Sequence, residues 1–134
     1  MQLACTVRQL GLAYAQAQAG GQDPRADQHH SCAYMREEYA QLSLVMSTRL
    51  DTCMEALRFL ARSSELQANR LLTAELRIRD FLTPVGTNRA AQRAALEELD
   101  NAVSREAELR PREASFWQEI SDFIARRLAT LNFD

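Results

Sequence analysis

The feature that most constrains this chain is a stretch without glycine or proline, from about Arg25 to Leu82. Apolar residues recur along it every three or four positions, the spacing that places side chains on one face of an α-helix. They are Met35, Tyr39, Leu42, Met46, Leu50, Cys53, Leu57 and Leu60. One unbroken helix over 25–82 would be roughly 85 Å long, which exceeds a compact domain of this size. We therefore expect either an elongated molecule or a helix that kinks or breaks.

The one internal weak point of this stretch is Ser63-Ser64. Ser64 and Gln67 have the spacing of a capping box, in which both side chains satisfy free amides at a helix N-terminus. This pattern favours a new helix start, whereas the helical spacing on either side favours a smooth passage. Both alternatives stay open.

The composition predicts an all-α protein that forms a single domain over residues 1–134. Leu and Ala total 39 residues, whereas Val and Ile total 7 and Gly and Pro total 7. Leu and Ala favour helix, and β-branched residues favour strands. The chain thus has the residues for several helices and few for a sheet.

Three further helices are expected, over 2–19, 88–109 and 111–132. The first has an apolar seam and ends at Gly20-Gly21, with Pro24 suited to the first position of the next helix. The others follow a turn at 83–88, where Pro84 cannot continue a helix and Gly86 frees the backbone. Pro111 either kinks the returning segment or starts its second helix.

Two architectures fit these elements. The helical segments before and after the turn near Val85 would form an antiparallel hairpin. Their weak points, Ser63-Ser64 and Pro111, lie at similar distances from the turn, so both segments could bend at the same level. The first architecture is an extended, coiled-coil-like antiparallel hairpin, whose base is 25–62 with 111–132 and whose tip is 64–109. The second folds the tip back onto the base as a bundle of four or five helices.

The charge and cysteine content limits the classes of function. The chain has 16 basic and 18 acidic residues, a net charge of −2, which favours neither nucleic acid nor an anionic membrane as a partner. All basic residues are arginine, so no lysine amine is available for chemistry. No apolar run reaches the length of a membrane span. Three cysteines, an odd number, favour reduced thiols and a cytoplasmic protein.

No motif predicts catalysis, a metal or a cofactor. The cluster His29-His30-Ser31-Cys32 holds ligand-type residues, but adjacent residues of a helix point about 100° apart and seldom bind one ion together. The adjacent pairs Glu37-Glu38 and Glu97-Glu98 are typical of solvated helix faces. A nucleophilic Cys32 beside His29 or His30 lacks any local sign of an oxyanion hole. We expect a protein that is not an enzyme.

Apolar helix faces are the predicted binding surfaces. In the extended hairpin the tip is rich in alanine and buries little area, so its larger apolar side chains would remain wet and need a second copy or a partner protein. If the tip folds back, the same residues instead complete the core of a monomer. Phe116 and Trp117 either share a wide core face, which the pattern favours, or turn one side chain to a partner, because aromatic residues are frequent at interface hot spots. The candidate contact residues are Leu96, Leu99, Val103, Phe116 and Trp117, with Leu71, Leu72, Leu76 and Ile78 on the facing side of the tip.

Arginines flank the turn of the hairpin and supply the remaining candidate contact residues, which are Arg77, Arg79, Arg89 and Arg93. Glu75 precedes Arg79 by four residues, as Asp122 precedes Arg126, and pairs of this kind are worth tenths of a kcal/mol. The sequence thus favours a protein-interaction module that is an adaptor, an assembly subunit or a secretion-type chaperone. The alternative is a small helical regulator that binds nucleic acid through these arginines.

Overall fold

The computed structural model describes residues 30–132, with side chains from Leu42 onward. Within this range the chain forms helices and no strand, so the all-α prediction is confirmed. The helices are α2 (His30–Arg62), α3 (Gln67–Leu82), α4 (Arg89–Leu109) and α5 (Ala114–Leu131), with short 3-10 turns at Thr83–Val85 and Pro111–Glu113. The helix expected over 2–19 lies outside the described residues.

The long stretch 25–82 does not form one helix, because α2 ends at Arg62 and α3 begins at Gln67, after four intervening residues. The Ser63 hydroxyl accepts a hydrogen bond from the Glu65 amide at 3.1 Å, which holds the turn. The capping box predicted at Ser64 is absent from this turn. The residue before α3 is Leu66, which provides no side-chain cap. The break therefore rests on contacts made elsewhere in the fold.

The later turns follow the predicted residues. Gly86 has φ 58° and ψ −132°, a conformation open to glycine and strongly disfavoured for other residues. Asn88 then caps α4, because its side-chain oxygen accepts from the Ala91 amide at 2.9 Å. Pro111 opens a 3-10 turn, so α5 begins at Ala114 within the predicted range 111–132.

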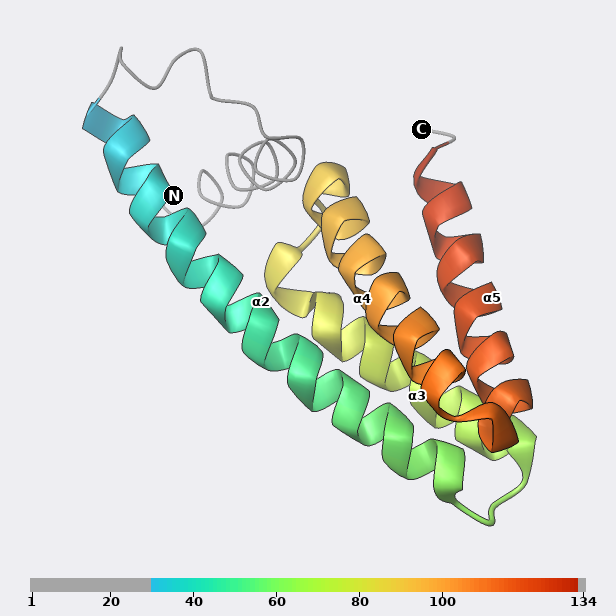
Figure 1. Cartoon of the computed structure of the whole chain (residues 1–134). Coiled ribbons are helices and arrows are strands. Elements are labelled where there is room, and N and C mark those ends of the chain that lie inside the picture. Colours follow the sequence, from blue (N-terminus) through green and yellow to red (C-terminus); the bar gives the residue numbers. More distant parts are fainter. Residues whose placement is uncertain (1–29, 133–134) are drawn as a thin grey trace.

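The four helices form two antiparallel hairpins, α2/α3 and α4/α5, which pack face to face (Figure 1). Between the hairpins, α3 packs against α5 and α2 against α4. This is the compact alternative, with the tip folded back onto the base at both weak points. α2 is twice as long as α3, 33 residues against 16, and its first turns run past the end of α3 (Figure 1).

The core lies between the two hairpins. Its largest fully buried side chains include Trp117, Phe116, Ile120 and Ile124 of α5. The helices α2, α3 and α4 contribute Met46, Leu57, Ile78, Leu96, Leu99 and Val103. Small buried residues of α4, Ala91, Ala95 and Ala102, permit close helix approach. Burial of each large apolar side chain contributes on the order of 1.5–3 kcal/mol.

Arginine side chains donate hydrogen bonds to carbonyls at the C-terminal ends of three helices, α2, α3 and α5. Arg70 of α3 donates to the carbonyls of Leu60 and Ala61 at the end of α2, each at 3.2 Å. Arg49 of α2 donates to the carbonyls of Asp80 and Phe81 at the end of α3. The last carbonyls of a helix lack partners within it, and a cation there also interacts favourably with the negative end of the helix dipole. Each helix of the α2/α3 hairpin thus caps the other.

The third such contact joins α4 to α5. Arg93 of α4 donates to the Leu131 carbonyl at 3.4 Å and to the Asn132 side chain at 3.0 Å. A guanidinium has several donors in a fixed plane and can serve two acceptors at once. Part of the arginine content of this lysine-free chain is therefore structural.

Two leucines of opposite exposure test the bundle. Leu99 is fully buried and Leu72 is 62% exposed. We expect Leu99→Ala to lower the free energy of unfolding by about 2–5 kcal/mol, because it leaves a cavity in the core. The matched control Leu72→Ala should change this free energy by less than about 0.5 kcal/mol. Urea unfolding followed by circular dichroism measures both, and equal losses would contradict the fold.

Candidate interaction surface

The five apolar residues predicted to contact a partner lie together in the interior. Leu96, Leu99, Val103, Phe116 and Trp117 are each at most 2% exposed. Phe116 and Trp117 meet edge to face, with ring centroids 5.3 Å apart, and the indole N–H donates to Glu113 at 3.0 Å. They are enclosed because the tip folds back onto the base. In this conformation their side chains cannot touch a partner, and they do not form the surface considered below.

The four arginines of the predicted cluster lie on either side of the 83–88 turn, and the structure gives them different roles. Arg93 caps α5, as described above. Arg77 faces Asp80 in a long ion pair of 3.9 Å between exposed side chains. Arg79 and Arg89 are exposed. The predicted pairs of Arg79 with Glu75 and of Arg126 with Asp122 do not reach ion-pair distance in the described part of the chain.

Large apolar side chains that remain exposed gather on one hairpin. Among the described residues they are Leu44, Val45, Phe59, Leu66, Leu72, Leu76 and Leu109. All but Leu109 belong to α2, α3 or the turn that joins them. Leu72 and Leu76 were expected to stay wet only in the extended hairpin, yet they are 62% and 58% exposed in this folded-back structure, whereas Ile78 of the same predicted strip is buried. The α2/α3 hairpin therefore carries the apolar surface of the described molecule.

The Phe59 side chain is 74% exposed, so this aromatic residue lies outside the core. The sequence pattern accounts for its exposure. Val45, Thr52 and Phe59 recur every seven residues, one position before the buried series Met46, Cys53 and Leu60. Adjacent positions on a helix point about 100° apart, so the two series cannot both face the core.

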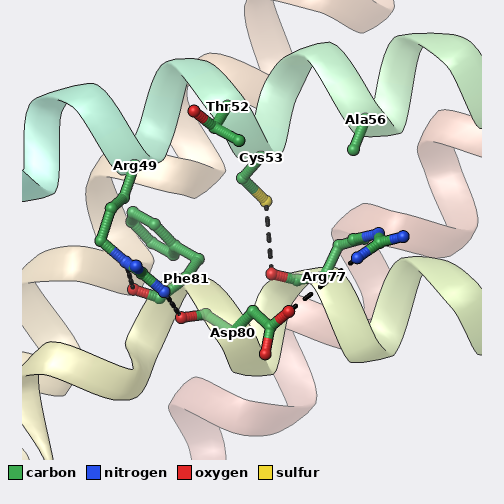
Figure 2. A pocket seen from close by; sticks show the side chains of 7 residues that line it. All are labelled: Arg49, Thr52, Cys53, Ala56, Arg77, Asp80 and Phe81. Carbon is green, nitrogen blue, oxygen red and sulfur yellow. Dashed lines mark hydrogen bonds and ion pairs between the residues drawn. The ribbon is translucent and has the colours of Figure 1, made fainter.

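A cavity of about 350 Å³ opens between α2 and α3 (Figure 2). It is lined by Arg49, Thr52, Cys53 and Ala56 of α2 and by Arg77, Asp80 and Phe81 of α3. Thr52 and Ala56 have short side chains, which leave the space between the helices unfilled (Figure 2). The groove thus combines a narrow apolar floor with charged groups of both signs.

The floor of the groove holds a thiol that is unsuited to nucleophilic chemistry. The Cys53 side chain is 4% exposed and points across to the Arg77 carbonyl, with 3.8 Å between sulfur and oxygen (Figure 2). Burial raises the pKa of this thiol to about 12, although the charges of Arg49 and Arg77 favour the thiolate. Cysteine nucleophiles act as thiolates, so Cys53 behaves as a small apolar side chain at neutral pH.

Glu106 links the two hairpins. Its carboxylate accepts hydrogen bonds from Arg58 of α2 at 3.0 Å and from Arg110 at 3.2 Å. Burial by itself would raise the pKa of this carboxyl, but the hydrogen bonds and charges of the two arginines outweigh it and hold the pKa below its ordinary value. A buried carboxylate held in this way serves as a structural ion pair rather than as an acid or base.

The described residues hold no group of three or more His, Cys, Asp or Glu placed to bind a metal ion. Of the cluster His29-His30-Ser31-Cys32, residues 30–32 begin α2, whereas His29 and the side chains of the other three lie outside the described part. None of the described helices combines the length and apolarity needed to span a bilayer.

Comparison of the chain with protein-family models, with curated proteins and with solved structures finds no match. The groove and the exposed apolar residues of the α2/α3 hairpin are therefore interpreted on their own chemistry.

The Glu106 ion pair predicts a pH-dependent loss of stability. At neutral pH, Glu106→Gln should lower the free energy of unfolding by about 1–3 kcal/mol, because it removes the charge from two hydrogen bonds. A carboxyl whose pKa is lowered on folding stabilises the fold above its ordinary pKa, and this contribution is lost as the pH falls through the lowered value. The difference between wild type and variant should therefore shrink in acid.

Urea unfolding at a series of pH values measures this difference, with Glu108→Gln, an exposed position on the same helix, as the matched control. A difference that grows as the pH falls would contradict the assigned role of Glu106.

The burial of Cys53 predicts slow alkylation. In a Cys5→Ser, Cys32→Ser variant, iodoacetamide at neutral pH should modify Cys53 orders of magnitude more slowly than it modifies the urea-unfolded chain, because the folded thiol is enclosed and protonated. Mass spectrometry over time gives both rates. A native rate close to that of the unfolded chain would mean that the groove floor is open and the thiol reactive.

Proposed function

We propose that this protein is a non-catalytic interaction module, an adaptor, assembly subunit or secretion-type chaperone, that binds a partner protein through the α2/α3 hairpin. The observation that carries the proposal is the concentration of exposed large apolar side chains on this hairpin. Single exposed apolar residues are ordinary on protein surfaces, whereas several on one structural unit are typical of binding surfaces.

The two hairpins differ in how they use their apolar residues. The large apolar residues of α4 and α5 are buried or packed against the core, with Leu109 as the exposed one among those described. Leu72 and Leu76 lie one helical turn apart on α3, so a helix that packs there can cover both. Covering one such side chain contributes on the order of 1.5–3 kcal/mol, from which the costs of association are subtracted.

The nucleic-acid alternative is less well supported by the arginines near the turn. Arg93 is engaged at the end of α5, and Arg77 lies beside the carboxylate of Asp80. Phosphate binding needs several cations on one accessible face, and it makes affinity fall steeply with salt. A protein partner held by apolar contacts should depend on salt much less.

The test compares capture by wild type with capture by Leu72→Ser/Leu76→Ser, each tagged and incubated in an extract of the native cells. We expect the double variant to capture at least 10-fold less of a specific protein than wild type does. Its helical spectrum and urea midpoint should stay near those of wild type, because both side chains are exposed. Leu109→Ser, from the other hairpin, is the matched control.

The same experiment is repeated at two salt concentrations and after nuclease treatment. Capture that survives both supports the protein-interaction proposal. The alternative outcome is capture of nucleic acid that falls steeply with added salt and is unaffected by the serine substitutions. That result would contradict the proposal and support a nucleic-acid-binding regulator.

A further inference from the structure

We propose that the groove between α2 and α3 binds one amphipathic helix of an acidic partner, with an apolar side chain inserted over Cys53 and Ala56 and a carboxylate placed on Arg77. This inference rests on the proposed function and deepens it, because it names the site and the chemistry of the partner.

Each helix presents a second seam beside its buried one. On α2 the seam recurs at intervals of four and three residues and consists of Val45, Arg49, Thr52, Ala56 and Phe59. None of these five side chains is buried, although the neighbouring core seam through Met46 and Leu57 is. Intervals of four and three are those at which a helix meets another helix in coiled-coil packing.

α3 provides the matching edge. Its seam begins at the N-cap and has the same intervals, with Leu66, Arg70, Thr73, Arg77 and Asp80. The two seams meet across the groove, because Arg49 reaches the end of α3, Arg70 reaches the end of α2, and the Cys53 thiol faces the Arg77 carbonyl. The two seams run side by side along the hairpin, and together they form a surface against which a third helix can pack.

The cavity between the two arginine contacts fixes where an anchor side chain enters. Arg49 lines the groove and contacts the end of α3, and Arg70 contacts the end of α2 beside the turn at 63–66. Between them the floor is Cys53 and Ala56, and the volume of about 350 Å³ is at the lower end of ligand-pocket sizes. Phe59 and Leu66, 74% and 75% exposed, provide apolar area beyond Arg70. An aliphatic or aromatic side chain fits this arrangement.

The charge of the groove favours an acidic helix. Two guanidinium groups and one carboxylate line the cavity. The Asp80 carboxylate lies 3.9 Å from Arg77, and the side chains are 72% and 53% exposed. An exposed pair at this distance contributes little, and a guanidinium has further donors, so Arg77 can take a second carboxylate without losing Asp80.

The experiment selects binders from a displayed library of helical peptides that are randomised on one face for charge and apolar size. Synthetic copies of the enriched peptides are then titrated into the full chain by fluorescence polarisation. Enriched peptides should carry apolar residues at helical spacing flanked by Glu or Asp. Thr52→Trp should weaken their binding at least 10-fold, because it closes the mouth of the groove at an exposed position that leaves the core intact.

Asp51→Trp is the matched control, since it adds the same side chain at the adjacent exposed position, and should leave binding unchanged. Arg77→Gln should weaken acidic peptides several-fold and make binding less sensitive to salt. Enrichment of basic peptides, binding indifferent to Thr52→Trp, or no enrichment at all would overturn the groove inference. Binding that is lost only with Leu72→Ser/Leu76→Ser would overturn it while leaving the proposed function in place.

Discussion

The reciprocal capping of α2 and α3 by Arg70 and Arg49 is the interaction on which the rest of this structure depends. The helical spacing on either side of 63–66 favours one continuous helix, and Ser63-Ser64 only weakens it locally. Two guanidinium groups instead satisfy the carbonyls that the break exposes, and Arg70 also lies over the Phe116 ring at 5.6 Å. Arg70 therefore connects the turn at 63–66 to the core that both hairpins share.

The sequence predicts the helices well because helical periodicity is a local property. The seam through Met46, Leu50 and Leu57, the turn at Pro84 and Gly86, and the new start at Pro111 all follow from neighbouring residues. The choice between an extended hairpin and a bundle depends on contacts between residues far apart in the sequence, such as that of Arg70 with the Phe116 ring. No pattern within a window of the sequence contains that contact, so both architectures stayed open.

The candidate surface was predictable in part for the same reason. Leu72 and Leu76 were expected to stay wet only in an extended hairpin and remain exposed in the bundle, whereas Leu99 of the same predicted strip is part of the core. The apolar character of these residues was evident in the sequence, but their partner was not. The groove was missed because it is defined by the short side chains of Thr52 and Ala56, and small residues give a weak signal until a facing helix is placed.

The chain reversal between α2 and α3 is tested most directly by the distance between spin labels at Thr48 and Asp80, two exposed positions, in a chain whose native cysteines are replaced by serine. In one continuous helix, 32 residues at 1.5 Å each would separate the labelled backbones by about 48 Å. In the hairpin the labels sit on packed helices whose axes are about 10 Å apart, so double electron–electron resonance should give a single distance below roughly 30 Å. A dominant distance near 48 Å would contradict the capped hairpin and the groove that it forms.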